Sequence, residues 1–573
     1  MNRDAFEALK AQGYRRIPVY RKVLADLDTP LSVYLKLADG PDAYLLESVE
    51  GGETWGRFSI IGLPAETRYV LEGNEIVTYH EGAEVGREAV DDPLDFVASL
   101  QETFNAARID ELPVFTGGLV GYFGYEIVQH FESRLRDDAK PDQLGTPDML
   151  LLQSEEVAVL DNLAGRLYLI VNVDPEAPEA WEHAQRRLDR LTYRLRCGSP
   201  GYGEAAVSHA PVTEANFSYG FSRGDFIRAV EKSKEYILSG DIFQVVLSQR
   251  MSVPFDARPL NVYRALRALN PSPYMYYIDL GDTQIVGSSP EVLVRVQDRK
   301  VTVRPIAGTR WRGDTPEEDR RLEEELLADP KERAEHLMLI DLGRNDVGRV
   351  AATGTVNVTD MMVIERYSHV MHIVSQVEGQ LAEGLTATDA IRSAFPAGTL
   401  SGAPKIRAME IINELEPVRR NVYAGAVGYL NWYDDTDLAI AIRTAVIKDG
   451  MLHVQAGAGI VADSDPEKEW EETMNKGRAL LNAGRGEEAR PVFEAAATTG
   501  QATQERRRTP PDAQPRGERR AGECGTPSGG GSAQFAAPPA VGAVAPGQGD
   551  RGPGGGGAIR AALEAPEAVG GGQ

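Results

Sequence analysis

The chain has 573 residues, of which 42% are apolar, and it carries a formal net charge of -25. This length allows two to four domains, and the acidity argues against nucleic acid or an anionic membrane as the main partner. We expect neither a secretion signal nor a membrane span, because no apolar run has the length that either needs. Cys197 and Cys524 lie far apart in unlike contexts, which predicts a reduced, cytoplasmic protein without structural disulfides.

Residues 1–200 are predicted to form an N-terminal region of short strands with helices near 91–105 and 178–195. A glycine-rich strand at 117–124 indicates close backbone packing, and its spacing does not fit a dinucleotide fingerprint. Residues 201–221 contain glycine, proline and serine and are predicted to be a linker.

A second region is predicted over 222–486, and Ser222 is expected to cap a helix at 223–239. Strand-like runs at 422–432, 437–448 and 451–461 are joined by short turns and predict an antiparallel meander. Strands and helices in separate runs favour an α+β fold, with antiparallel sheets, over a doubly wound parallel sheet. Residues 487–573 hold no lysine and few large apolar side chains, so this tail is predicted to be disordered.

Two helix starts carry the same pair of carboxylates. Asp329-Pro330 is followed by Glu332 and Glu335, and Asp465-Pro466 is followed by Glu469 and Glu472. An aspartate cap and a proline at the first position are typical helix starts, and residues three apart share one side of a helix. Four inward carboxylates would suit a hard divalent cation such as magnesium. The alternative for either motif alone is a solvated helix face.

Further strings in the second region combine glycine, threonine, histidine and basic residues. They are GSSPE (287–291), RPIAGTR (304–310), YSHVMHIVS (367–375), AGTLSGAPK (397–405) and GAG (457–459). Glycine amides and threonine hydroxyls make anion-binding concavities, and Arg443 and Lys476 could add charge for a small dicarboxylate. Each string also has a structural interpretation, and a lone histidine such as His372 is more often a core residue.

Residues 20–486 resemble the magnesium-dependent chorismate-utilising enzymes, and within them the anthranilate synthase component I group. The matching strings are LLES (45–48), GDIFQ (240–244), NPSPYM (270–275), PIAGTR (305–310), KERAE (331–335), AGTLSG (397–402) and EWEET (469–473). The resemblance implies an α/β sandwich of antiparallel sheets with helices outside. It also implies conversion of chorismate and ammonia to anthranilate and pyruvate, the first step of tryptophan biosynthesis.

The resemblance also assigns roles to individual residues. Glu335 and Glu472 would hold Mg²⁺ directly, and Glu332 and Glu469 would complete its shell. Glu291 would be the general acid, His372 would assist the elimination beside Thr399, and Gln244 would lie at the nucleophile's position. The chorismate-binding set would be Gly308, Thr309, Tyr423, Arg443, Gly457, Ala458, Gly459 and Lys476.

Ammonia implies a partner, because neither cysteine has the setting of a glutaminase nucleophile. The resemblance therefore implies a separate glutamine amidotransferase subunit, in a heterotetramer with two copies of each chain. It also implies a feedback pocket for tryptophan, in which Ser48 would bond the amino acid and Pro273, Tyr274 and Met275 would surround the indole. From the residue types alone, these two stretches are an ordinary strand and an ordinary turn.

Several alternatives share the metal motifs. Sister enzymes make aminodeoxychorismate, isochorismate or salicylate, and a phenazine-type enzyme stops at aminodeoxyisochorismate. Water-using sisters carry lysine where this chain has Gln244, and aminodeoxychorismate synthases commonly carry lysine where it has Ala307. The absence of both lysines favours ammonia as the nucleophile. A non-catalytic binding subunit would keep the fold, but the intact acidic and basic residues argue against it.

Overall fold

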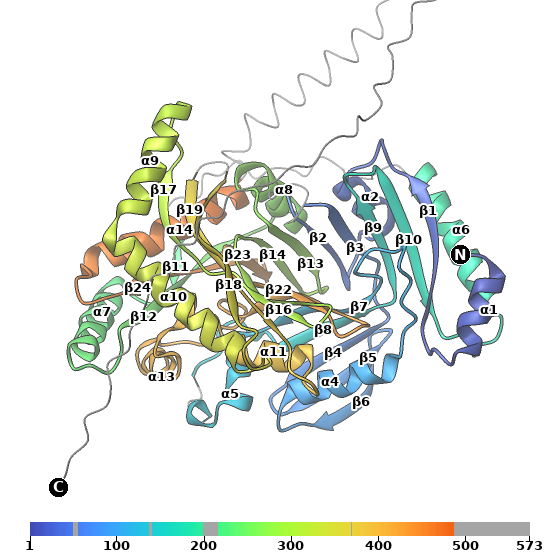
Figure 1. The fold of residues 1–573 in the computed structure, drawn as a ribbon, viewed down its shortest axis with the longest axis horizontal. Coiled ribbons are helices and arrows are strands. Elements are labelled where there is room, and N and C mark those ends of the chain that lie inside the picture. Colours follow the sequence, from blue (N-terminus) through green and yellow to red (C-terminus); the bar gives the residue numbers. More distant parts are fainter. Residues whose placement is uncertain (50–55, 137–139, 199–215, 368–369, 486–573) are drawn as a thin grey trace, which may run out of the picture. The chain divides into compact units, whose positions relative to one another are not determined.

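Two antiparallel sheets face each other in the computed structural model, which describes residues 1–49, 56–136, 140–198, 216–367 and 370–485 (Figure 1). The side chains of residues 479–485 are not among those described. Within this part of the chain each sheet has 12 strands, and the residues belong to one compact unit. The tail predicted over 487–573 and most of the predicted linker lie outside the described residues.

The first sheet runs from one end of the molecule to the other. Its strands, in spatial order, are β1 (Ile17–Leu24), β10 (Arg166–Val173), β9 (Glu156–Asp161), β3 (Phe58–Gly62), β2 (Ala43–Glu47), β13 (Tyr274–Asp279), β14 (Thr283–Ser289), β23 (Thr444–Lys448), β24 (Met451–Ile460), β12 (Gln244–Pro254) and β11 (Ser218–Tyr219), with β20 (Gly402–Ala403) paired to β12.

The second sheet lies against the first. Its strands, in spatial order, are β17 (Ile306–Trp311), β19 (Val370–Gln380), β16 (Lys300–Val303), β15 (Val292–Gln297), β22 (Thr436–Ile440), β21 (Ala426–Asn431), β7 (Gly118–Phe123), β8 (Met149–Ser154), β4 (Thr67–Glu72), β5 (Glu75–His80) and β6 (Ala83–Ala89), with β18 (Asn357–Arg366) paired to β19.

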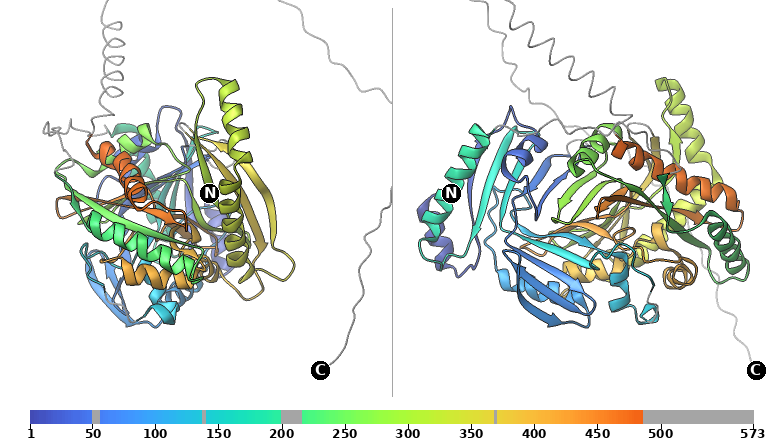
Figure 2. Two further views of the ribbon diagram at one scale, coloured as in Figure 1. Left: turned by 90° about the vertical axis from the view of Figure 1, so that its left-hand side faces the viewer. Right: turned by 180° about the vertical axis from the view of Figure 1, so that it is seen from behind.

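Helices cover the outer faces of the two sheets, and Figure 2 shows α1 and α6 over the end formed by β1 and β10. The α-helices are α1 (Arg3–Ala11), α2 (Pro30–Leu37), α4 (Pro93–Phe104), α5 (Val128–Phe131), α6 (Ala180–Cys197), α7 (Arg223–Leu238), α8 (Pro259–Leu269), α9 (Pro316–Ala328), α10 (Pro330–Gly348), α11 (Ala387–Ala394), α12 (Gly398–Ser401), α13 (Lys405–Leu415) and α14 (Pro466–Arg485). Two short 3-10 helices, η1 (Tyr125–Ile127) and η2 (Ser133–Leu135), flank α5. In the described part of the chain, no helix is both long and apolar enough to cross a membrane.

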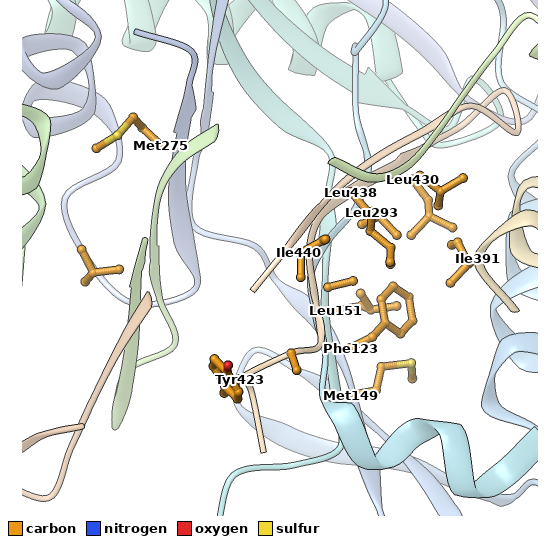
Figure 3. Close-up of a cluster of buried hydrophobic side chains, with 14 of the residues drawn as sticks. Phe123, Met149, Leu151, Met275, Leu293, Ile391, Tyr423, Leu430, Leu438 and Ile440 are labelled. Atoms are coloured by element: carbon orange, nitrogen blue, oxygen red, sulfur yellow. The ribbon is translucent and has the colours of Figure 1, made fainter. Parts of the chain in front are cut away.

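The period-2 alternation of the strands builds two layers of core. Tyr276 and Ile278 of the first sheet share one apolar cluster with Val120 and Val427 of the second, so this cluster lies between the sheets. The intervening residues form the layer beneath the helices. Figure 3 shows part of that outer layer, in which Phe123, Leu151, Leu430 and Leu438 gather opposite Ile391 of α11. This architecture confirms the predicted α+β sandwich of antiparallel sheets with outer helices.

Both predicted regions contribute strands to both sheets. In the first sheet β2 pairs with β13, so that Tyr44 lies opposite Ile278, and in the second β7 pairs with β21. A glycine of β7 permits this pairing, because a Cβ on Gly118 would lie 2.1 Å from the carbonyl oxygen of Leu430 in β21. The assignment of separate functions to residues 1–200 and 222–486 stays a prediction.

The predicted meander over 422–461 is wrong at its middle strand. The run 437–448 is two strands in different sheets: β22 ends at Ile440 in the second sheet, and β23 begins at Thr444 in the first. Between them Arg443 has φ of 48°, in the left-handed region that a non-glycine residue rarely adopts. Sequence reasoning missed the crossing because the apolar alternation continues through it without glycine or proline.

Candidate active site

A cavity of about 1130 Å³ lies where the two sheets meet the starts of α10 and α14. It is lined by nearly every residue that the sequence singled out for metal, substrate and catalysis. These lining residues are Gln244, Glu291, Gly308, Thr309, Glu332, Glu335, His372, Thr399, Tyr423, Arg443, Gly457, Gly459, Glu469, Glu472 and Lys476. The fold therefore brings together positions that are more than 200 residues apart in the chain.

The two helices that carry the carboxylates begin as predicted. Asp329 caps α10 by accepting hydrogen bonds from the amides of Lys331 (3.0 Å) and Glu332 (3.3 Å). Asp465 accepts from the amides of Glu467 (3.0 Å) and Lys468 (3.3 Å) at the start of α14. Each cap fixes the first helical turn, and so directs the following E-x-x-E pair toward the cavity.

The carboxylates of the two helices are close enough to affect one another's ionisation. Burial raises the pKa of the Glu335 carboxyl, and the negative charges of Glu332 and Glu472 raise it further. Burial also raises the pKa of Glu469, to which the charge of Glu472 again contributes. This mutual repulsion is electrostatically unfavourable and indicates a site that favours positive charge.

Basic side chains hold two of these carboxylates. Lys476 Nζ lies 2.7 Å from Glu472 Oε1, and it also donates to the carbonyl oxygen of Gly457 at 3.0 Å. Arg310 of β17 lies 3.4 Å from Glu332 Oε1, and it donates to Asp329 Oδ2 at 2.9 Å. Within the described residues, no three His, Cys, Asp or Glu side chains are gathered into a ready metal-binding cluster.

His372 forms the opposite wall on β19, and its ring is held in one orientation. Its Nδ1 lies 3.1 Å from the carbonyl oxygen of Gly308 and 3.1 Å from Thr309 Oγ1. Because a carbonyl only accepts, the bond to Gly308 places the proton on Nδ1 and leaves a lone pair on Nε2. Burial lowers the pKa of His372 to about 4, so the ring is neutral near pH 7 and Nε2 can accept a proton.

Glu291 lies between β14 and β15 and is only 7% exposed. Burial raises the pKa of its carboxyl to about 8, although the nearby Thr399 hydroxyl and the charge of Arg443 act in the opposite direction. The side chain is therefore largely protonated at neutral pH and can donate a proton.

Glycines on β24 leave room for larger side chains from the neighbouring elements. A Cβ on Gly457 would lie 2.8 Å from the Tyr423 hydroxyl, and one on Gly459 would lie 2.5 Å from Gln244 Nε2. Ala458 is fully buried, alternates to the other face of the strand and does not line the cavity. The predicted substrate set thus lies together, with the side chain of Ala458 pointing away.

The two strings predicted to bind tryptophan lie side by side, and Asn270, Pro271 and Ser272 of the second string line the active-site cavity, whereas Ser48, Pro273, Tyr274 and Met275 do not. Met275 of β13 is opposite Glu47 of β2, and the amide of Val49 donates to the Ser272 carbonyl at 3.2 Å, on either side of Ser48. Pro273 and Tyr274 line a separate cavity of about 270 Å³. Met275 is 1% exposed and packs in the layer beneath the helices, so adjacent Tyr274 and Met275 face opposite sides of the sheet.

Comparison with known proteins agrees with this geometry. A family model described as "chorismate binding enzyme" matches residues 49–482. The chain belongs to this family.

Individual chorismate binding enzymes resemble the chain along nearly their whole length. It is 60% identical to anthranilate synthase component 1 of Pseudomonas putida, over 84% of this chain and 98% of that one. It is 58% identical to the same component of Pseudomonas aeruginosa, over 84% of this chain and 98% of that one. The crystal structure of anthranilate synthase component I from Streptococcus pneumoniae matches with a TM-score of 0.67 and 39% identity, over 80% of this chain and 98% of that one. The menaquinone-specific isochorismate synthase of Escherichia coli, at 20% identity, a TM-score of 0.59 and coverage of 84% and 99%, shares the fold.

The donor set fits a magnesium ion of the kind expected for a chorismate binding enzyme. Carboxylate oxygens from two helices face one cavity, and the pKa values of Glu335 and Glu469, raised mainly by burial, are raised further by neighbouring negative charge that a cation would neutralise. The four glutamates are the residues that would hold the ion, in place of the present partners of Glu332 and Glu472.

Some lining residues carried no signal that sequence reasoning could use. Gln455 and Asn475 line the cavity but belong to no motif. Arg310 was part of a noted string without an assigned role, and its contacts link β17 to the end of α9 and the start of α10. An arginine at the end of a strand, followed at close range by several acidic residues, was the available indication.

Proposed function

We propose that this chain is the large subunit of an anthranilate synthase, which converts chorismate and ammonia to anthranilate, pyruvate and water. The observation that carries the proposal is the single cavity, in which a protonated Glu291 and a neutral His372 stand with four further glutamates and with basic side chains that include Arg443 and Lys476. A relative that is 60% identical and bears the name anthranilate synthase component 1 supports it.

The basic residues bind the anionic substrate. Arg443, just before β23, and Lys476, on α14, line the cavity together with Gly457 and Gly459 of β24, and the two basic residues supply charge for the two carboxylates of chorismate. Bound magnesium would supply the positive charge that the ring carboxylate needs beside the glutamates. Fixing the ring in this way places the attacked carbon on a defined path for ammonia.

Glu291 and His372 then move the protons. Ammonia adds to the ring carbon next to the carboxylate, and the ring hydroxyl leaves as water with a proton from Glu291. His372 Nε2 takes the proton from the carbon that now bears nitrogen. The enolpyruvyl carbon–oxygen bond breaks, and the departing enolate takes up a proton to become pyruvate. The ammonium group formed on addition loses its extra proton, and the ring becomes aromatic.

The decisive experiment mixes the pure chain with chorismate, magnesium and ammonium, and follows anthranilate by its fluorescence. We expect anthranilate without any second protein, and no product from glutamine alone. The variant Glu471→Gln, an exposed carboxylate on α14 outside the cavity lining, is the matched control and should behave as wild type. Accumulation of an amino acid that keeps the enolpyruvyl group would favour the phenazine-type alternative, and isochorismate would favour a water-using sister.

Glutamine is expected to serve as nitrogen donor only in a complex with an amidotransferase subunit. The name component 1 borne by the relatives implies a second component, and we infer a heterotetramer with two copies of each chain. Light scattering on the reconstituted mixture measures the assembly. Turnover of glutamine by this chain alone would contradict the two-subunit arrangement.

Feedback by tryptophan belongs to the same proposal. Strands β2 and β13 come from the two halves of the chain and pair with each other, so a tryptophan site at this pair would contact residues from both halves. We expect Ser48→Phe to leave catalysis largely intact and to raise the tryptophan concentration needed for inhibition by about tenfold or more. A tryptophan titration at fixed chorismate tests this, and coincident curves for wild type and variant would reject the pocket.

A further inference from the structure

Arg420 is a wholly buried charge directly behind the cavity wall. It follows α13, its residue is 2% exposed, and it is among the largest fully buried side chains among the described residues. Its Nε donates to Glu416 Oε2 at 2.8 Å and its Nη2 to Glu416 Oε1 at 2.5 Å. A buried arginine with a bidentate carboxylate avoids the cost of an isolated charge, but such a pair is weak evidence for stability by itself.

The remaining donors of Arg420 reach the backbone of two residues that line the cavity. Nη1 donates to the carbonyl oxygen of Leu400 at 2.8 Å, and Nη2 donates to that of Val246 at 2.7 Å. Leu400 follows Thr399 in α12, and Val246 lies two residues after Gln244 in β12. One guanidinium therefore joins two separate segments that carry candidate site residues.

Tyr423 is fixed by the same group. Its ring lies 5.7 Å from the guanidinium carbon of Arg420, and its hydroxyl reaches the glycine strand β24. Glu416 extends the arrangement further along β12, where its Oε1 accepts hydrogen bonds from the amide (2.8 Å) and the hydroxyl (2.9 Å) of Ser248.

The first part of the chain closes this arrangement from the other side. The ring of Tyr125 lies 4.8 Å from the guanidinium carbon of Arg420. Glu126 accepts from the amides of Arg420 at 2.7 Å and Asn421 at 2.9 Å. Residues of η1 thus hold the loop that places both Arg420 and Tyr423.

We propose that Arg420 is a positioning residue for the reaction: through Leu400 and Val246 it sets where Thr399, Gln244 and Tyr423 stand in the cavity. This inference rests on the proposed function, because that function supplies the reaction whose rate Arg420 would affect. Only a planar fork of several donors can bond one carboxylate and two carbonyls from different segments at once, whereas a lysine ammonium is a single point of charge. Displacement of a positioned group by about 1 Å can lower a rate by about a hundredfold.

The test compares Arg420→Lys with Arg250→Lys. Arg250 is also a buried arginine, 3% exposed, and donates to Asn421 and Gln143, neither of which lines the active-site cavity. Initial rates with ammonium at varied chorismate give kcat and KM, and chorismate consumption is followed together with anthranilate. We expect Arg420→Lys to lower kcat at least about tenfold and to change KM for chorismate less than about threefold. Arg250→Lys should change both by less than about twofold.

A paired variant separates positioning from the loss of an ion pair. Glu416→Gln combined with Arg420→Gln leaves no lone buried charge, so we expect circular dichroism to show a folded protein that has the same loss in kcat. A normal kcat in Arg420→Lys, an equal fall in Arg250→Lys, or a rise in KM that matches the fall in kcat would each overturn the proposal. If neither Arg420 variant folds, Arg420 serves the fold and the proposal is wrong. If wild type consumes chorismate without forming anthranilate, the proposed function fails, while the ratio of variant to wild-type consumption still tests positioning.

Discussion

The two walls of the cavity use the same residue type in opposite ways. On the helix wall, Glu335 and Glu469 are half-buried, stand among other carboxylates and have pKa values raised by burial and by their neighbours' charges. On the strand wall, Glu291 is almost wholly buried, and its pKa reaches about 8 mainly through burial. The helix wall is therefore built to hold positive charge, and the strand wall to hold and release a proton.

The difference lies in what surrounds each carboxylate, since the sequence provides a glutamate in every case. Carboxylates at the starts of α10 and α14 keep contact with solvent and cations, as Glu472 does with Lys476. Glu291 is almost wholly buried, and burial outweighs the opposing charge of Arg443 on its pKa, so its neutral form is favoured. Variants at each wall should consequently fail in different ways.

The largest expected effect is on the helix wall. Glu335→Gln keeps the shape of the side chain but removes one charge, and we expect activity with ammonia to fall about a thousandfold because a metal contributes several kcal/mol. Calorimetric titration with magnesium should show weaker binding in the same variant, independent of activity. Glu471→Gln is the control, and near-normal activity of Glu335→Gln at low magnesium would contradict the assignment of this wall.

On the strand wall, Glu291→Gln should lower kcat about a hundredfold, the size typical of a lost general acid. Magnesium affinity should remain that of wild type, since this residue stands apart from the four glutamates. Steady-state kinetics and the same calorimetric titration measure the two effects. A fall in magnesium affinity without a fall in kcat in Glu291→Gln would contradict the roles assigned to the two walls.

The pH dependence of wild type sharpens the comparison. Glu291 must be protonated to donate, so the rate should be constant below its pKa of about 8 and fall about tenfold for each pH unit above it. His372 stays neutral throughout this range because its pKa is about 4. A pH–rate profile at saturating chorismate and a constant concentration of unprotonated ammonia measures this, and the residual activity of Glu291→Gln should lack the alkaline fall. An alkaline fall that persists in the variant would mean that another group donates the proton.

The smallest expected effect concerns the two helix starts. Asp465→Ala removes a cap and should cost about 1 kcal/mol of stability, measured by urea unfolding. Asp329→Ala should cost more, because Asp329 also accepts from Arg310 at 2.9 Å. Equal losses in the two variants would show that Arg310 adds nothing to the start of α10.

Much of the site could be predicted from local patterns, because helix caps and E-x-x-E spacing depend on only a few adjacent residues. Sequence reasoning correctly placed Asp329 and Asp465 at helix starts and Ser222 as the cap of α7. It failed where an observation depends on packing. Nothing near Arg443 marks the crossing between sheets, and the alternation that turns Ala458 away from the cavity follows from a strand register known only in the fold. The hydrogen-bond partners of Arg420 lie on segments between 4 and 294 positions away, with no shared motif.

Each sheet joins a block of strands from the first half of the chain to a block from the second half at one strand pair, so neither half can complete a sheet alone. Strand β2 near residue 45 pairs with β13 near residue 277, and β7 near residue 121 pairs with β21 near residue 428. During synthesis β2 is therefore an open edge until β13, which ends at Asp279, has been made, and β7 is an open edge until β21, which ends at Asn431, has been made. Pairings over such sequence distances close slowly and leave unpaired edges exposed, so the two sheets should be completed late in synthesis, and folding should be sensitive to concentration.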